Sequence, residues 1–379
     1  MTEPADVSPL TKANNHLAVE LMKLLGEEGK NVFFSPFSLS TAMAMLYLGT
    51  QGQTSKELRH ALGYHVANLE DSDLTSSCRK YLDDLEKTPD SYVLSCANSI
   101  VSDKSFAVKE AFKSTVVETF KALLVEVDFL NEKEKAIEQI NDWVSTKTQK
   151  MIPQLLDKLP PLTVMVLLNA VYFKGNWLTQ FNAKHTNKEK FHSRGNEAKK
   201  VDMMHLKEEF AYMEEDSFKA LELPYKGKEV AMMILLPHKV DGLKKLESKL
   251  SSSFVQNTKK NMYTRKVAVS LPKFRMEYSK SMVDDFKKMG VNKIFFPGGE
   301  FDGINPSKDL YVADIVHKAV LVVNEEGSEA AAATAVVMAL RCAPKREFTF
   351  VADHPFLFVI YDTRSNLILF MGKVETLEN

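Results

Sequence analysis

The chain has 379 residues, of which 45% are hydrophobic and 26% are charged, and its 49 Lys and Arg nearly balance its 50 Asp and Glu. This composition excludes a disordered tail, a collagen and a small disulfide-stapled domain. With a formal net charge of −1, no global field draws the chain to nucleic acid or to an anionic membrane, and neither is an expected partner. No apolar run reaches the roughly 18 residues of a membrane-spanning helix.

The first third of the chain carries apolar residues at helical spacing, broken at Gly63, Pro89 and Pro153. This pattern predicts helices over Leu10–Leu25, Ser40–Leu48, Ser55–Leu62, Asp73–Glu86, Lys109–Phe120 and Glu132–Lys150. Alternating or continuous apolar runs, typical of strands, dominate the remainder. They cover Tyr92–Val101, Val164–Phe173, Ala231–Leu236, Val267–Leu271 and Phe356–Tyr361.

Helices and strands are therefore segregated rather than alternating. Segregation favours an α+β architecture with largely antiparallel sheets over a doubly wound fold. No internal repeat and no Gly/Ser-rich or Pro-rich linker divides the chain. We interpret residues 1–379 as one domain.

The motifs of common enzymes are absent. The sequence contains no GxSxG, HExxH, GxxxxGK[ST] or strand-linked GxGxxG pattern, and its nine histidines show no metal-ligand spacing. His317 lies within the apolar run Val312–Val323, where a hydrogen-bonded interior histidine is favoured over a ligand or a base. We expect neither a metal nor a cofactor, and no enzymatic activity.

Three cysteines, Cys78, Cys96 and Cys342, lack the spacing of a zinc site. Their odd number leaves at least one thiol unpaired, and a bridge between Cys78 and Cys96 stays open. Arg79 and Lys80 suggest a polyanion site on the helix over residues 73–86. The acidic residues of the same helix cancel that charge, so a solvated face is favoured and a glycosaminoglycan cofactor is not supported.

One segment has contradictory preferences. Residues Glu325–Arg341 read EEGSEAAAATAVVMALR, in which the alanines favour a helix while Thr334, Val336 and Val337 favour a strand. Such local conflict is typical of functional sites. As a strand of period two, the segment places Ser328, Ala330, Ala332, Thr334, Val336, Met338 and Leu340 on one uncharged face. That face can enter an existing sheet without burying a charge.

Arg341 closes this segment. A basic side chain on a long exposed loop is a recognition point for a protease whose specificity pocket holds a carboxylate. The alternative is an Ala-rich surface linker with a solvated arginine. The segment by itself does not decide between a bait loop and a linker.

Five blocks elsewhere in the chain bear on that choice. They are NVFFSPFSLSTAMAMLYLGTQGQTSKEL (Asn31–Leu58), LLNAVYFKGNW (Leu167–Trp177), LPKF (Leu271–Phe274), HKAVLVVNEEGSEAAAATA (His317–Ala335) and DHPFLFVIYD (Asp353–Asp362). In this order they resemble the signature blocks of the serpins, the serine protease inhibitor family. The resemblance spans nearly the whole chain. Within the family, the sequence most resembles secreted arthropod inhibitors, particularly those of tick saliva.

The resemblance implies a single-domain α+β fold with three mostly antiparallel β-sheets, about nine helices and an exposed reactive centre loop at residues 325–347. It places the scissile bond between Arg341 and Cys342, preceded by Leu340. It also implies a metastable inhibitor that acts once. The protease serine attacks the Arg341 carbonyl, and the cut loop then inserts as a new strand and traps the acyl-enzyme.

Three further groups of residues are implied by the match. The hinge, where insertion starts, comprises Gly327, Ser328, Glu329, Ala330, Ala331, Ala332 and Ala333. The shutter beneath the sheet comprises Ser35, Pro36, Ser38, Asn169 and His317, and the breach comprises Trp177, Lys273 and Glu325. The hinge follows the inhibitory pattern without departure, which favours an inhibitor over a non-inhibitory carrier or binding serpin.

Two residues at the predicted scissile bond add to what the resemblance implies. Cys342 replaces the more common Ser after the scissile bond and adds a thiol that can be oxidised. Leu340 suits general trypsin-like proteases, so the expected partner is a trypsin-like serine protease held in a covalent complex by a monomeric inhibitor. Residues before the first helix and the tail ETLEN favour an extracellular protein whose signal has been replaced by Met1.

Overall fold

The computed structural model describes residues 8–27, 29–86, 92–159, 163–193, 198–325 and 347–377. Most of its helices precede residue 150, as the sequence predicts. The helices are α1 (Pro9–Leu25), α2 (Pro36–Leu48), α3 (Gly52–Ala61), α4 (Tyr64–Ala67), α5 (Asp71–Glu86), α6 (Glu110–Phe120), α7 (Lys133–Lys147), α8 (Leu243–Glu247), α9 (Ser252–Lys260) and α10 (Val283–Lys288).

The strands form two hydrogen-bonded sheets. Five strands form the smaller sheet in the order β10-β11-β4-β2-β3, with bounds β10 (Phe274–Ser281), β11 (Val312–Val323), β4 (Met165–Gly175), β2 (Tyr92–Asp103) and β3 (Leu123–Val127). The larger sheet contains β1 (Val32–Phe34), β14 (Ile368–Val374), β13 (Phe356–Asp362), β8 (Val230–Pro237), β7 (Phe218–Pro224), β6 (Lys199–Glu214), β9 (Tyr263–Pro272), β12 (Phe348–Val351) and β5 (Asn187–Phe191).

The α+β class with mostly antiparallel strands is confirmed, but the described strands join into two sheets where three were expected. The reason is the length of β6. Its first residues pair with β5 and its middle pairs with β9, while Ala211–Glu214 pair with β7. One 16-residue strand thus connects two sets of strands into a single network of nine.

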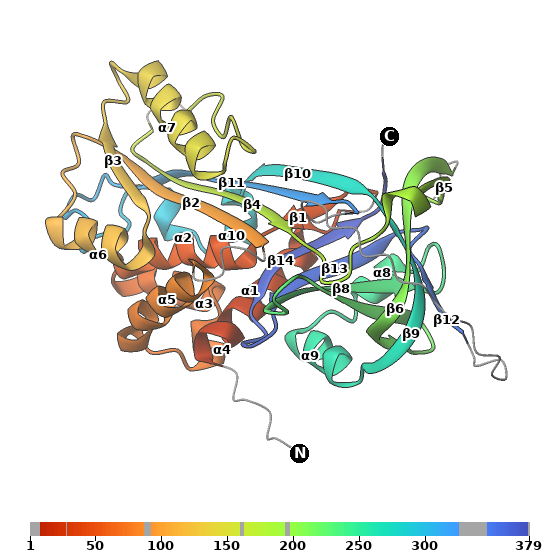
Figure 1. Cartoon of the computed structure of the whole chain (residues 1–379). Helices are drawn as coiled ribbons and strands as arrows, with labels where there is room; N and C mark the ends of the chain where they lie inside the picture. The colour runs from red at the N-terminus through yellow and green to blue at the C-terminus, as the bar shows by residue number, and fades with distance from the viewer. Residues whose placement is uncertain are drawn as a thin grey trace.

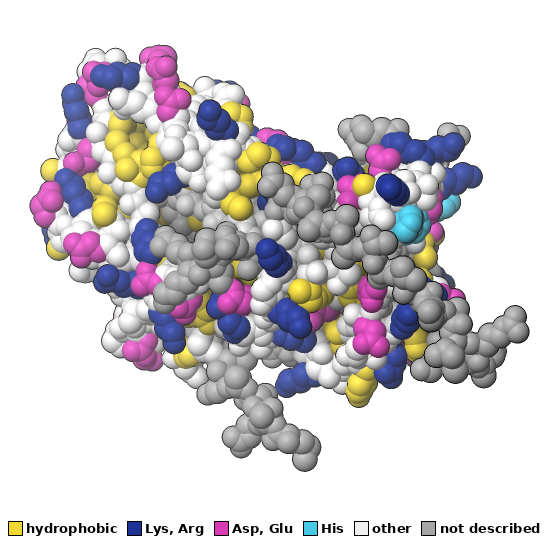
Figure 2. Space-filling view, in the orientation of Figure 1, with side chains coloured by type: hydrophobic (Ala, Val, Ile, Leu, Met, Phe, Trp, Pro, Cys, Tyr) yellow, Lys and Arg dark blue, Asp and Glu magenta, His cyan; other side chains and the backbone are white. Residues whose placement is uncertain are grey.

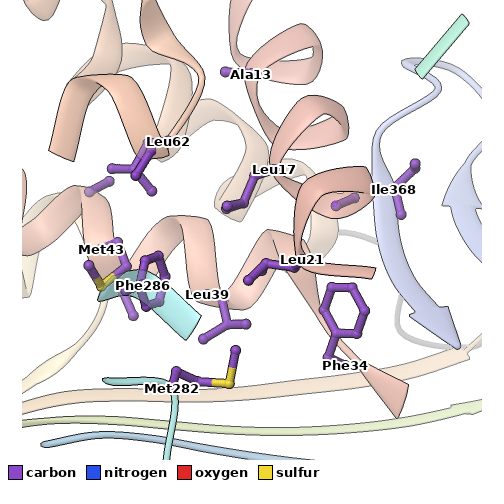
Figure 3. Packing of buried hydrophobic residues seen from close by; sticks show 14 of the residues in the cluster. Ala13, Leu17, Leu21, Phe34, Leu39, Met43, Leu62, Met282, Phe286 and Ile368 are labelled. Atoms are coloured by element: carbon purple, nitrogen blue, oxygen red, sulfur yellow. The ribbon is translucent and has the colours of Figure 1, made fainter. Parts of the chain in front are cut away.

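Two hydrophobic layers enclose the five-stranded sheet. On one face, Ala136, Ile140 and Val144 of α7 pack on strand residues such as Leu168 and Val320. On the other face, α1 and α2 pack under the sheet, and Figure 1 shows α7 and α2 on opposite sides of it. In Figure 3, Leu17, Leu21 and Leu39 of these two helices point toward one another beside Phe34 of β1. The central strands β4 and β11 are buried on both sides, so they read as nearly continuous apolar runs.

Helix α2 begins earlier than the sequence pattern predicts, at Pro36 rather than Ser40. The Ser35 side chain accepts a hydrogen bond from the Ser38 amide, and Pro36 occupies the first turn, where its missing N–H costs nothing. Apolar periodicity does not mark this start because all of the helix except Leu48 is buried. The cap places Ser35 and Ser38 directly beneath the five-stranded sheet.

Among the described residues, none of the helices has the length and apolar character needed to cross a membrane.

Cys78 and Cys96 are both free thiols. Burial raises the pKa of each to about 12, so neither is a reactive thiolate at neutral pH. The bridge that the sequence left open is not formed. Figure 2 shows positive and negative side chains interspersed over the visible face.

Candidate functional site

The centre of the five-stranded sheet contains a parallel pair of strands. β4 and β11 are neighbours through nine register pairs, from Met165–Val312 to Phe173–Leu321. Their outer partners are both antiparallel: β2 pairs with β4, and β10 pairs with β11. Because parallel pairs are slightly less stable per residue than antiparallel pairs, this line between β4 and β11, called the seam below, is the weakest ladder at the centre of the sheet.

The seam ends before its flanking ladders do. The pairing of β4 with β11 stops at Phe173 and Leu321. The ladder of β2 with β4 continues to Gly175, and the ladder of β10 with β11 continues to Val323. The two central strands therefore separate at the end from which the chain leaves β11 toward residue 325. A further strand could start between them there.

A buried polar cluster lies beneath the middle of the seam. Asn169 of β4 and His317 of β11 are direct register partners, and both are fully buried. The Asn169 Nδ2 donates to Ser38 Oγ at 2.5 Å and also to Asn98 Oδ1 of β2. Ser38 Oγ lies 3.3 Å from the same Asn98 oxygen. One amide thus links helix α2 to three adjacent strands.

The His317 ring has a defined tautomer. Its Nε2 accepts the Ser35 backbone N–H at 3.3 Å, so its proton lies on Nδ1, which donates to Asn169 Oδ1 at 2.5 Å. Complete burial lowers the pKa of His317 to about 3. The ring is therefore neutral at physiological pH and acts as a structural bridge across the seam rather than as a base.

Ser35 connects this cluster to the larger sheet. Its Oγ donates to the Leu369 carbonyl of β14 at 2.7 Å while accepting the Ser38 amide at 3.1 Å. Pro36 follows at the first turn of α2. The family resemblance implied that five residues lie beneath the sheet, and the structure places all of them here: Ser35, Pro36, Ser38, Asn169 and His317.

A second cluster lies at the open end of the seam. The Trp177 indole Nε1 donates to the Asn324 carbonyl at 2.9 Å, and its ring stacks on Tyr225 with centroids 4.4 Å apart. The Lys273 ammonium lies 2.9 Å from Glu325 Oε2. The three predicted breach residues, Trp177, Lys273 and Glu325, therefore converge where the chain leaves β11.

The Glu325 carboxylate is held in several ways. It is only 8% exposed, and its Oε1 accepts the Thr186 hydroxyl at 2.9 Å. Its backbone carbonyl accepts the Phe181 amide at 3.0 Å. Burial raises its pKa, but the hydrogen bonds from Lys273 and Thr186 outweigh burial, and the pKa is lowered. Glu325 is thus an anchored, ionised start for the segment that follows.

The predicted hinge residues Gly327, Ser328, Glu329 and Ala330–Ala333 lie outside the described residues. So do Leu340, Arg341 and Cys342 at the predicted scissile bond. Their assignment stays a prediction from sequence. The described chain fixes only the two ends of this segment, at Glu325 and at Glu347.

Two residues of these clusters were missed by sequence reasoning. Asn98 is a polar side chain inside the apolar run Tyr92–Val101, and that interruption was a signal of a buried polar network. Thr186 gives no comparable signal because it lies in an irregular stretch. Within the described ranges, no group of three or more His, Cys, Asp or Glu is arranged to hold a metal ion.

Comparison with known proteins agrees with this geometry. Residues 12–377 match the family model for Serpin (serine protease inhibitor). The chain belongs to the serpin family, whose members are mainly protease inhibitors.

The relatives include proteins of arthropods and of primates. The chain is 38% identical to Intracellular coagulation inhibitor 2 of Tachypleus tridentatus, over 97% of this chain and 91% of that protein. It is 39% identical to Iripin-2 of the tick Ixodes ricinus, covering 97% and 94%. It is also 39% identical to Serpin B6 of Macaca fascicularis, covering 96% and 98%. The predicted resemblance to tick serpins is confirmed.

Solved structures share the fold. Serpin48 of the insect Tenebrio molitor, described as a highly specific serpin, has a TM-score of 0.83 at 35% identity, covering 98% of this chain and 97% of that one. Human thyroxine-binding globulin in complex with its hormone has a TM-score of 0.89, covering 98% and 99%. At 24% identity, the second likeness shows the fold alone.

The expectation of an extracellular protein is wrong. Relatives that match as well as the tick proteins include Intracellular coagulation inhibitor 2 and Serpin B6, and they point to a protein that is not secreted. The residues before the first helix and the tail ETLEN do not report a compartment.

Proposed function

We propose that this chain inhibits trypsin-like serine proteases as a suicide substrate. The protease cleaves the bond between Arg341 and Cys342, and the loop inserts between β4 and β11. The observation that carries the proposal is the seam: a parallel pair of strands, open at the end where the loop begins and bridged underneath by a neutral hydrogen-bonded cluster.

The gain from insertion can be counted in backbone pairs. Nine parallel register pairs now join β4 and β11. A strand that runs back from Glu325 would be antiparallel to both neighbours and would pair on each side. The number of pairs would about double, and at about 1 kcal/mol of net stability per hydrogen bond the gain is on the order of 10 kcal/mol. This is comparable to the whole stability of an ordinary domain.

The length of the loop supports displacement of a bound protease. Arg341 lies 16 residues after Glu325, and an extended strand of that length spans about 54 Å. β4 has 11 residues and spans about 37 Å at the same rise. If Glu325 stays in its cluster, full insertion would carry Arg341, and an enzyme acylated by it, past the far end of the seam.

The uncharged face of the loop suits this space. Small side chains at Ser328, Ala330, Ala332 and Thr334 would enter the sheet without burying a charge. Arg341 supplies the positive charge that a trypsin-like specificity pocket recognises. Leu340 adds no selectivity of the kind that Pro or Gly would give.

The proposal is tested by incubating the full chain with trypsin and separating the products under denaturing conditions. We expect an SDS-resistant adduct whose mass is close to the sum of inhibitor and protease. Arg341→Ala should abolish this adduct because the specificity pocket loses its charge partner. Arg79→Ala is the matched control, since it removes an arginine from an exposed helix face and should leave the adduct unchanged.

The alternative is a non-inhibitory serpin that acts as a carrier or binding protein. Such a protein would be cleaved at the loop as a simple substrate. Cleavage of the chain by trypsin with full release of active enzyme and no adduct would therefore reject the inhibitor proposal.

A further inference from the structure

An aromatic and cationic cluster lies where the chain returns from the loop. The guanidinium carbon of Arg265 lies 5.6 Å from the ring centroid of Tyr263 and 5.8 Å from that of Phe348. Phe348 in turn packs against Tyr212 with centroids 5.4 Å apart. Cation–π contacts of this kind hold the guanidinium in place. We call Tyr263, Arg265 and Phe348 the β9 patch.

The outer part of the β9 patch faces solvent. The Tyr263 side chain is 64% exposed, and Arg265 is also exposed. One guanidinium nitrogen of Arg265 donates to the Thr264 carbonyl at 3.0 Å. Within the described ranges, Arg265 has no carboxylate partner. Its remaining donors are therefore available to an anionic group from another molecule.

The patch is built on rigid supports. Tyr212, the cross-strand partner of Tyr263, is only 4% exposed. Phe348 opens β12, which pairs in parallel with β9 from Val267 onward. The preceding residue, Glu347, forms an ion pair with Lys207 of β6. Tyrosine and arginine held in this way lose little conformational entropy on binding, and both are enriched among interface residues that carry binding energy.

Covalent geometry keeps the patch close to the predicted scissile bond. Six residues separate Arg341 from Glu347, so the two lie at most roughly 20 Å apart along the chain. A protease domain of about 200 residues is roughly 40 Å across. A protease seated on Arg341 therefore extends over the neighbourhood of Phe348.

We propose that Tyr263 and Arg265 form a second contact for the attacking protease, with Arg265 binding a carboxylate on the protease surface and Tyr263 packing beside it. This inference rests on the proposed inhibitory function and adds a determinant of specificity outside the loop. Arg341 would select trypsin-like proteases as a class, and the β9 patch would favour those with an acidic surface loop near the active site.

The test is a set of second-order inhibition rate constants for the full chain against a panel of trypsin-like proteases. For the protease that the unmodified chain inhibits fastest, Tyr263→Ala and Arg265→Ala should each slow inhibition roughly 5- to 20-fold. The Arg265→Ala effect should shrink as NaCl is raised from about 0.05 to about 0.5 M, since the contact is between charges. Arg265→Lys should restore only part of the rate, because a lysine lacks the planar fork of donors.

A matched control removes the same chemistry elsewhere. Lys287 lies 5.2 Å from the ring centroid of Phe296, which is 56% exposed. Lys287→Ala and Phe296→Ala should leave every rate unchanged. The stoichiometry of inhibition should be the same in all variants, since none of them touches the seam.

The outcomes separate the two proposals. If Tyr263→Ala and Arg265→Ala stay within about twofold of the unmodified chain for every protease while adducts still form, the β9 patch is not a protease contact and the inhibitory function stands. If the unmodified chain forms no adduct with any member of the panel, both proposals fall.

Discussion

The His317 imidazole makes the seam sensitive to pH. Its neutral form accepts the Ser35 amide and donates to Asn169, and burial lowers its pKa from 6.5 to about 3. Protonation would place a donor opposite a donor and a charge inside the core. In the unfolded chain, the imidazole is in water and can be protonated without this cost.

This difference gives a pH dependence with a defined sign. Because the folded pKa is depressed, the unfolded chain binds a proton below pH 6.5 that the folded chain does not. The stability contributed by His317 is complete above pH 6.5 and is lost as the pH falls toward 3. At pH 5 the loss is about 2 kcal/mol. We expect the thermal midpoint to fall between pH 7.5 and 5 by more in the unmodified chain than in His317→Gln.

The exposed His185 provides the control, since His185→Gln should keep the pH dependence of the unmodified chain. An identical pH dependence in His317→Gln would show that the ring is not the sensitive group. Carboxylates titrate at lower pH and contribute equally to all three proteins, so the comparison isolates the histidine.

Among the elements, the step on which the proposed mechanism depends is the separation of β4 from β11. Ala319 and Val171 are register partners across the seam, and both are buried. Neighbouring strands place paired Cα atoms about 5 Å apart, within the range that a disulfide spans. Cys96 of β2 is the other register partner of Val171, so it is first replaced by Ser in both cross-linking variants. In that background, the double variant Ala319→Cys with Val171→Cys should close the seam when oxidised. We expect the oxidised form to be cut by trypsin without forming an adduct, and reduction to restore the adduct.

The control cross-link lies on the other side of β4. Ala97 and Ala170 pair between β2 and β4, two strands that stay together in the proposed mechanism. The variant Ala97→Cys with Ala170→Cys should form adducts in both redox states. Adduct formation by the oxidised Ala319–Val171 cross-link would rule out insertion between β4 and β11.

The sequence predicts the strands whose apolar residues form a continuous run. β4 and β13 are buried along nearly their whole length, and their apolar runs were recognised. β6 and β10 were not, because exposed charges such as Lys207 and Glu277 interrupt their pattern. The joining of the sheets through β6 depends on pairing between distant strands, which no local pattern encodes.

The two polar clusters also combine residues that could be predicted with contacts that could not. The family resemblance named the residues of both clusters, yet their hydrogen bonds depend on geometry that only the fold supplies. Asn98 joins the shutter cluster because β2 is in register with β4, with Asn98 opposite Asn169. Thr186 reaches Glu325 from a stretch 139 residues away in sequence.

For the whole molecule, the proposed mechanism requires the intact chain to be less stable than the chain cleaved at the loop. In the proposed mechanism, the five-stranded sheet accepts one more strand, which the segment between Glu325 and Glu347 supplies. A chain of this kind gains stability when it is cut, whereas an ordinary domain loses stability or stays the same when a surface loop is nicked.

Thermal unfolding before and after cleavage of the loop measures this difference in stability. The chain is nicked at the loop by a catalytic amount of a metalloprotease, which forms no acyl-enzyme that the loop could trap, and is then purified and melted beside the intact protein. We expect the midpoint to rise by roughly 12 °C, because the unfolding entropy of a 379-residue chain is about 0.8 kcal/mol/K and the gain is on the order of 10 kcal/mol. An unchanged or lower midpoint would show that the cleaved loop does not add a strand to the sheet.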